Sequence, residues 1–228
     1  MTIKLAQLEG QAEIFHSIQG EGVSQGVPCV FLRLAGCNLA CSWCDTAYSW
    51  NGTEPPLALK AEEAAEIILQ YPCRRLVITG GEPLVQQKAL PALLALLPDH
   101  AVEMETNGTI VPDKALVNRV EQFNVSPKLP HAGNEASRAW RPGVLRLLAG
   151  TGKAWFKFVA SCEQDVLDVL QLAEETDLPL ERIMVMPLAT DRATLEAMRP
   201  QAVGWCLRYG LRYCDRLHIA VWGNKKGV

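Results

Sequence analysis

The chain has 228 residues, of which 49% are hydrophobic and 21% charged, and its formal net charge is −3. This is the balance of a globular protein with a substantial core, and the charge gives no reason to expect a nucleic acid or an anionic membrane as partner. No apolar run approaches the roughly 20 residues of a membrane-spanning helix, and the N-terminus has no signal-peptide pattern. We therefore expect a cytoplasmic protein whose eight cysteines are thiols or metal ligands.

Strand and helix patterns alternate along the chain. Expected strands cover residues 28–36, 74–83, 101–108, 123–128, 153–160, 182–188 and 216–221; helical spacing covers 61–70, 86–97, 113–121, 165–175 and 192–198. The stretch 128–153 is irregular and rich in Gly and Pro, and we interpret it as an excursion or lid. Such alternation favours parallel βα units. Because six or so units are too few for a closed eight-stranded barrel, we predict one α/β domain over residues 1–228, a partial, open βα barrel with about six parallel strands.

Four unusual polar or glycine-rich motifs directly follow expected strands. They are "GCNLACSWCDT" (36–46), "TGGEP" (79–83), "ETNGT" (105–109) and "SPK" (126–128). In parallel βα folds the chemistry gathers at the carboxyl ends of the strands. We therefore expect the four motifs to meet in one site.

The first motif contains three cysteines, Cys37, Cys41 and Cys44, with the spacing C-x3-C-x2-C. A structural zinc site normally takes four ligands in separated pairs, and here no second pair exists and all four histidines are isolated in the sequence. A four-iron cluster bound by three cysteines instead leaves one iron open to a small molecule. The other cysteines lie in apolar segments, where we expect them to pack in the core: Cys29, Cys73, Cys162, Cys206 and Cys214.

The loop resembles the signature C-x3-C-x-aromatic-C of the radical S-adenosylmethionine superfamily, with Trp43 as the aromatic residue. The resemblance implies one [4Fe-4S] cluster whose open iron binds S-adenosylmethionine, and a flavodoxin-type reductant. "TGGEP" resembles the superfamily's GGE motif, with the carboxylate of Glu82 expected at the rim of the site to bind the methionyl amine. By the same resemblance, further cofactor contacts come from Trp43, Gly81, Ser126, Pro127 and Lys128.

The segment "EIFHSIQGEGVSQGVPCVFLRLAGC" (13–37) resembles the 7-carboxy-7-deazaguanine synthase family of queuosine biosynthesis, and the likeness extends from about residue 12 to the C-terminus. It implies a lyase that converts 6-carboxy-5,6,7,8-tetrahydropterin to 7-carboxy-7-deazaguanine with release of ammonia, and a homodimer. Arg33 has the planar fork that pairs with a carboxylate, and Thr46 matches a magnesium ligand of the family. The implied substrate contacts are Ile18, Gln19, Gly20, Arg33, Thr79 and Glu105, with Glu21 beside them.

Two departures from the family pattern leave residues without an assigned role. Met186 stands where some members have a glutamine before the proline of the late strand, and the tail "GNKKGV" continues past the tryptophan to Val228. Two other functions stay open at this point. A glycyl-radical-enzyme activase has a similar cysteine loop but does not explain Arg33 or Thr46, and a non-catalytic iron–sulfur electron carrier needs a fourth cysteine near the cluster.

Overall fold

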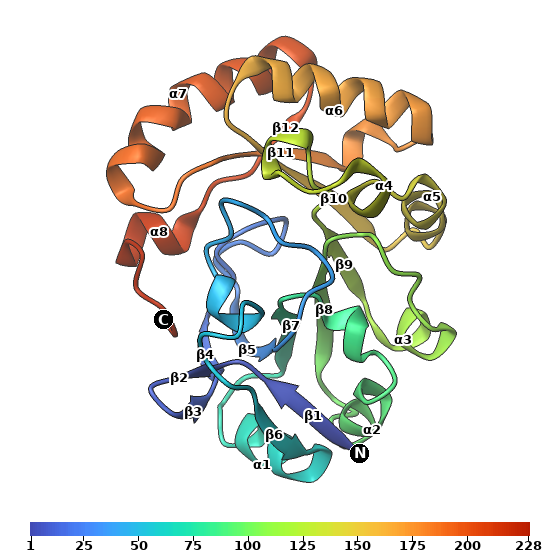
Figure 1. Cartoon of the computed structure of the whole chain (residues 1–228), viewed down its shortest axis with the longest axis vertical. Helices are drawn as coiled ribbons and strands as arrows, with labels where there is room; N and C mark the ends of the chain where they lie inside the picture. Colours follow the sequence, from blue (N-terminus) through green and yellow to red (C-terminus); the bar gives the residue numbers. More distant parts are fainter.

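A computed structural model describes all 228 residues and contains a ten-stranded, mostly parallel sheet with the helices arranged around its outside (Figure 1). The parallel strands are β5 (Pro28–Leu34), β7 (Arg75–Gly80), β8 (Ala101–Thr106), β9 (Gln122–Val125), β10 (Ala154–Ala160), β11 (Ile183–Pro187) and the two-residue β12 (Arg212–Tyr213). They pair in chain order, each beside the next. The prediction of an open βα barrel with about six parallel strands is confirmed.

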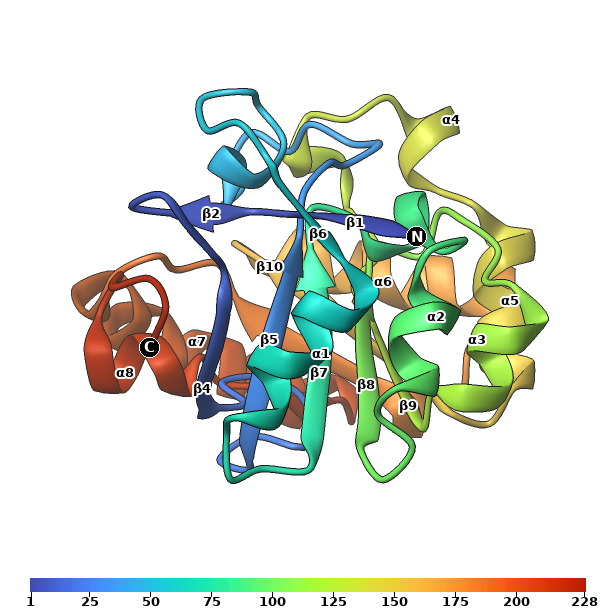
Figure 2. The same cartoon turned by 90° about the horizontal axis from the view of Figure 1, so that it is seen from below.

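The N-terminal strands add antiparallel partners that the sequence analysis did not anticipate. They are β1 (Thr2–Leu5), β4 (Ile14–Ile18) and β6 (Leu57–Lys60), with β2 (Gln7–Leu8) and β3 (Gln11–Ala12) forming a separate hairpin. Strand β4 lies along β5, whereas β1 meets β5 only where Leu5 pairs with Leu34 (Figure 2). The first part of the chain thus covers the free side of β5.

The helices follow the predicted order with shifted ends. They are α1 (Ala61–Leu69), α2 (Leu90–Ala95), α3 (Lys114–Arg119), α4 (Ala136–Ala139), α5 (Pro142–Gly150), α6 (Glu163–Thr176), α7 (Arg192–Tyr209) and α8 (Leu217–Trp222), with short 3-10 turns η1 (Ala47–Ser49), η2 (Pro83–Gln86), η3 (Pro130–Ala132) and η4 (Leu180–Arg182). The helix expected over residues 86–97 is shorter because Pro91 lacks an N–H and is accommodated only in the first turn of α2. No helix has the length and apolar character needed to cross a membrane.

Three expectations were wrong. Residues 216–221 form helix α8 and not a strand, because β12 already occupies the sheet edge and Ile219 packs with Ala189 and Leu195. The stretch 128–153 is not wholly irregular, since it contains α4 and α5. Cys162 is exposed at the N-terminus of α6 and Cys73 is only half-buried, so only the other three scattered cysteines pack in the core.

Side chains alternate along the central strands between an apolar outer layer and a polar inner face. On β10, Phe156 and Phe158 are fully buried in the main core, while Lys157 between them lines a cavity. Strand β8 repeats the pattern, with Met104 in the core and Glu105 at the cavity. Because successive strand residues point to opposite faces, the same strands build the core and aim polar groups inward.

Phe156 provides a test of the outer core. Truncation by Phe156→Ala removes a fully buried ring and is expected to lower the free energy of unfolding of the cluster-free protein by about 3–5 kcal/mol. Leu207→Ala is the matched control, because Leu207 is 81% exposed on α7 and its loss is expected to change that free energy by less than about 0.5 kcal/mol. Urea denaturation measures both, and equal effects would contradict this assignment of the core.

Candidate active site

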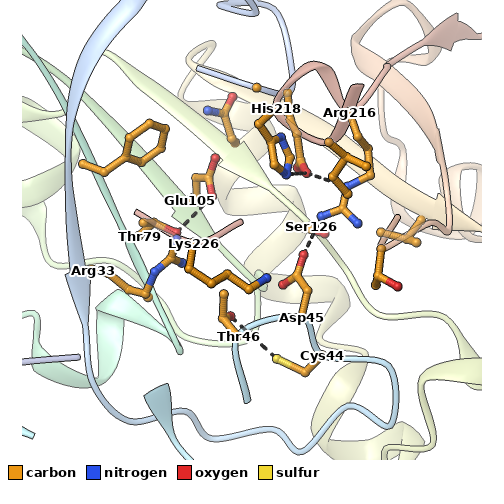
Figure 3. Close-up of a pocket in the computed structure, with 18 of the residues that line it drawn as sticks. Arg33, Cys44, Asp45, Thr46, Thr79, Glu105, Ser126, Arg216, His218 and Lys226 are labelled. Atoms are coloured by element: carbon orange, nitrogen blue, oxygen red, sulfur yellow. Dashed lines mark hydrogen bonds and ion pairs between the residues drawn. The ribbon is translucent and has the colours of Figure 1, made fainter. Parts of the chain in front are cut away.

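One cavity opens at the carboxyl ends of the parallel strands and brings the four motifs together (Figure 3). All but two of the predicted site residues line it. Those present are Ile18, Gln19, Gly20, Arg33, Cys37, Cys41, Trp43, Cys44, Thr46, Thr79, Gly81, Glu105, Ser126 and Lys128. The two exceptions are Glu82 and Pro127, both of which are buried behind the cavity wall. The four motifs therefore meet in one site at the carboxyl ends of the strands, as predicted. The roles of the individual residues stay predictions.

The cysteine loop presents its three sulfurs to this cavity, and each sulfur accepts at least one N–H group. The closest donors are Leu39 N to Cys37 Sγ at 3.4 Å, Asn134 Nδ2 to Cys41 Sγ at 3.1 Å and Trp50 Nε1 to Cys44 Sγ at 3.3 Å. Donors around sulfur favour the thiolate, which is the form that binds iron. The donor set fits a three-cysteine [4Fe-4S] cluster.

Burial raises the pKa of the Cys37 thiol to about 11, and the nearby Glu82 carboxylate adds to the rise. Without metal this group is therefore a neutral thiol at pH 7. Iron has to displace the proton, so cluster assembly at this position releases a proton.

The two glycines of "TGGEP" let the loop after β7 lie directly against the cysteine loop. Gly81 N donates to Leu34 O at 3.0 Å, and Glu82 N donates to Gly36 O at 2.8 Å. A Cβ on Gly81 would stand 2.2 Å from Gly36 O, closer than any real contact. Glycine is thus required here for the approach of two backbone segments, in addition to any approach of a ligand.

Glu82 does not stand at the rim of the cavity, and that expectation was wrong. Its side chain is fully buried and accepts from Leu84 N at 3.0 Å, Thr106 Oγ1 at 2.8 Å and Asn107 N at 2.6 Å. Burial raises its pKa, although these hydrogen bonds oppose the rise. The carboxylate ties the end of β7 to the end of β8, and its contact with the methionyl amine stays a prediction.

The "ETNGT" loop fastens the cysteine loop from the other side. Asn107 Nδ2 donates to Asn38 Oδ1 at 3.0 Å, and Asn38 Nδ2 donates to Thr109 Oγ1 at 2.8 Å. Asn107 Oδ1 in turn accepts from the N–H and hydroxyl of Thr109. These contacts make the motif a support of the cysteine loop.

A second polar cluster lies in the same cavity, on the strands β7 and β8 and the loop after β4. Glu105 accepts from Thr79 Oγ1 at 3.0 Å and from Gln19 Nε2 at 3.2 Å. Each carboxylate oxygen retains a free lone pair for a ligand N–H group. The backbone of Gly20 is less available than expected, because Gly20 is buried and its carbonyl already accepts from Leu217 N at 2.9 Å and from Gln25 Nε2 at 3.0 Å.

Arg33 projects from β5 into the cavity. Its Nε donates to Glu13 Oε1 at 2.8 Å, and Glu13 is also held by the hydroxyl of Tyr48. The opposing carboxylate raises the pKa of Arg33 despite its burial. Neither Nη group donates to the protein, so a charged, oriented fork remains for an anionic ligand.

A buried charge network, which the sequence analysis missed apart from Glu21, joins the two ends of the chain. Arg216 Nε donates to Glu21 Oε1 at 2.9 Å, Lys157 pairs with the other oxygen of Glu21, and Arg216 also pairs with Asp45. Burial opposes ionisation of Glu21, but the two cations outweigh it and hold its pKa below the usual range. The only signal was the phrase "IQGEG", because "RLHIAV" looks like an ordinary apolar segment.

The C-terminal tail follows helix α8 and turns back toward the barrel (Figure 1). Residues 223–228 of this tail line the cavity. His218 lies over Gly20, where a Cβ would stand 2.1 Å from its ring. Lys226 crosses the cavity between Arg33 and Asp45, and its positive charge is among those that lower the pKa of Asp45 (Figure 3). It makes no ion pair within the protein, so the tail adds a free cation to the site.

The side of the cavity near β9 and β11 is less polar. Trp43 packs beside His131 with ring centroids 5.6 Å apart, and its buried Nε1 has no partner. Lys128 Nζ stands 5.7 Å from the Trp43 ring and donates to the carbonyl and hydroxyl of Ser126. Met186 packs in a small cluster next to Trp43 and lines the cavity. The aromatic face of Trp43 at the cavity wall fits an adenosine group.

The fit of a magnesium ion is limited to one protein ligand. Thr46 offers a hydroxyl 3.8 Å from Cys44 Sγ, while the neighbouring Asp45 carboxylate is engaged by Arg216. Magnesium commonly retains waters and binds substrate oxygens, so a single hydroxyl is compatible with it. The ion stays a prediction.

The fold and the cysteine loop define an enzyme that holds an iron–sulfur cluster with an open iron. A family model described as the radical SAM superfamily matches residues 32–199, and the chain belongs to this superfamily. Its cofactors are therefore a [4Fe-4S] cluster and S-adenosylmethionine.

More specific similarities span nearly the whole chain. The 7-carboxy-7-deazaguanine synthase of Pyrobaculum aerophilum is 39% identical, covering 94% of this chain and 95% of the relative, and that of Thermoplasma acidophilum is 46% identical, covering 95% and 98%. The crystal structure of QueE from Escherichia coli matches the fold with a TM-score of 0.70 and 24% identity over 96% of this chain and 95% of that chain. Within the superfamily, the chain belongs to the 7-carboxy-7-deazaguanine synthase family.

The close approach at Gly81 leads to a prediction about cluster assembly. Gly81→Ala is expected to push the loop after β7 away from Gly36 and to lower the iron content after reconstitution several-fold. Gly143→Ala, in open space on α5, is expected to load iron normally. Iron and sulfide analysis of the reconstituted variants measures the cluster content. Normal iron loading of Gly81→Ala would contradict the requirement for glycine at this position.

Proposed function

We propose that this protein is a 7-carboxy-7-deazaguanine synthase, a carbon–nitrogen lyase that contracts the ring of 6-carboxy-5,6,7,8-tetrahydropterin and releases ammonia. The observation that carries the proposal is the composition of one cavity. It has three thiols at one end, and at the other the hydrogen-bonding groups of Glu105 and the free fork of Arg33. These groups suit a flat heterocycle with several N–H donors and one carboxylate.

The chain's own residues bind and orient this substrate. Glu105 accepts hydrogen bonds from N–H groups of the heterocycle. Gln19 and Thr79 donate to the Glu105 carboxylate and hold it in place. Arg33 pairs with the substrate carboxylate and so fixes the position of the carbon that bears it. Residues 223–228 cover the site and limit the access of water.

Cys37, Cys41 and Cys44 would hold the cluster, which, once reduced by one electron, would supply the reductive cleavage of S-adenosylmethionine and thereby hydrogen abstraction at the carboxylate-bearing carbon. The cysteine loop holds the cluster and its bound cofactor at a fixed distance from the substrate. Trp43, Gly81, Ser126 and Lys128 hold the methionyl and adenosyl groups in this proposal, and Thr46 with substrate oxygens and water holds magnesium.

We also propose an oligomeric state, a cellular location, a pathway and an electron donor for this protein. We expect a homodimer in the cytoplasm, acting in queuosine or related deazapurine synthesis, with a flavodoxin-type protein as the electron donor. Support for a small-molecule substrate comes from the cavity at the strand ends, which gathers the hydrogen-bonding groups and the free Arg33 fork. A glycyl-radical activase would need to admit a polypeptide segment, and here the tail at residues 223–228 forms part of the cavity wall.

The direct test is anaerobic reconstitution followed by addition of S-adenosylmethionine, a low-potential reductant and the carboxylated tetrahydropterin. Mass spectrometry is expected to show 7-carboxy-7-deazaguanine formed over many turnovers. Cys44→Ala, which removes one cluster ligand, is expected to form neither this product nor 5′-deoxyadenosine. A wild-type protein that forms 5′-deoxyadenosine but no deazapurine would contradict the substrate while leaving the superfamily assignment intact.

Lys226 gives a more specific prediction. If its free ammonium pairs with the substrate carboxylate beside Arg33, Lys226→Met is expected to raise KM about tenfold with a smaller change in kcat. Arg33→Ala is expected to raise KM by about ten- to 100-fold, although it also leaves the buried Glu13 without its partner.

Lys88→Met is the matched control, because Lys88 is 83% exposed and remote from the cavity wall. Binding of a tetrahydropterin that lacks the carboxylate supplies the second comparison, and Lys226→Met is expected to leave it unchanged. A normal KM in Lys226→Met, or an equal loss of affinity for both pterins, would contradict the pairing.

A further inference from the structure

Two side chains outside the cysteine signature donate close hydrogen bonds to the cluster-binding sulfurs, and a third, Asn107 Nδ2, lies 4.0 Å from Cys37 Sγ. Asn134 Nδ2 lies 3.1 Å from Cys41 Sγ, and Trp50 Nε1 lies 3.3 Å from Cys44 Sγ. Asn134 is 93 residues from Cys41 in the chain, in the stretch between η3 and α4. Such contacts are separate from the local backbone donor at Cys37, which any loop of this length could supply.

The orientation of the Asn134 amide is fixed by its other contact. Its Oδ1 accepts from Ala40 N at 2.8 Å. Because a backbone N–H can only donate, the amide end that faces Ala40 must be the oxygen. The nitrogen therefore faces Cys41, and the hydrogen bond to sulfur does not depend on an arbitrary assignment of the amide.

The surrounding segment is held to the cysteine loop by further contacts, so Asn134 has little freedom to turn away. Ser42 N donates to Ala132 O at 3.0 Å, and Arg138 Nη2 donates to Asn38 O at 2.8 Å. Residues 132–138 thus follow the cysteine loop along its outer side. The sequence analysis read this region only as an excursion or lid.

We infer that Asn134 and Trp50 are positioning residues that raise the reduction potential of the [4Fe-4S] cluster. Reduction adds one electron to the cluster, and part of its charge resides on the sulfurs, so an N–H dipole aimed at a cysteine sulfur stabilises the reduced form more than the oxidised form. Both residues touch ligands of the cluster and neither replaces one. The inference rests on membership of the superfamily and not on the proposed substrate.

The test is an EPR-monitored redox titration of the reconstituted holoenzyme without substrate. Trp50→Phe keeps an aromatic ring but removes the N–H, and Asn134→Leu keeps a similar volume but removes the donor. Each variant is expected to lower the ratio of reduced to oxidised cluster at a fixed potential by about tenfold, as for one hydrogen bond to a charged group. For a one-electron couple this is a fall of about 59 mV in midpoint potential.

Ser137→Ala is the matched control, because Ser137 lies in the same segment as Asn134 and its hydroxyl donates to Glu135 and contacts no sulfur. Its midpoint potential is expected to equal that of the wild type at equal iron content. If Asn134→Leu fails to load iron because Ala40 loses its acceptor, Trp50→Phe decides alone. Unchanged or raised potentials in loaded variants, or an equal fall in Ser137→Ala, would overturn the inference.

Discussion

The site depends on the contact between two backbone segments that have no side chains between them. The loop after β7 donates from Gly81 N and Glu82 N to the carbonyls of Leu34 and Gly36 at the end of β5. This pair of hydrogen bonds sets the distance between the cysteine loop and the strand ends that carry the substrate groups. The buried carboxylate of Glu82 extends the same support to β8. A side chain at Gly81 would clash with Gly36 and separate the two loops. This one glycine therefore sets how two of the four motifs lie against each other.

The opposite wall of the cavity is stabilised by charge. Glu21, from the N-terminal part of the chain, is paired with Lys157 of β10 and with Arg216 just before α8. Buried ion pairs add little net stability compared with apolar packing, but removing one partner is costly because a buried charge remains. The network therefore specifies where the C-terminal helix docks and, through it, where the tail with Lys226 lies. The same ion pairs therefore connect the substrate end of the cavity to the C-terminal tail.

The sequence predicted the fold class, the strand ends and nearly all of the cavity lining, because parallel strands bring their carboxyl ends to one edge and the motifs there are rich in unusual residues. It did not predict α8, since six alternating residues suit either a helix or a strand. It placed Glu82 at the rim because a motif does not say which way a carboxylate points. Arg216, Lys226 and Asn134 were missed for a common reason: each acts through a partner 90 or more residues away or through a tail whose path only the folded chain reveals.

The open iron is the feature on which the chemistry rests, and the most direct measurement is electron–nuclear double resonance on the reduced holoenzyme with S-adenosylmethionine labelled with 15N at the methionyl amine. Three cysteine ligands predict a strong coupling between that nitrogen and one unique iron of the cluster. A reduced cluster that shows no coupling to the label, with all four irons held by the protein, would contradict the entire interpretation.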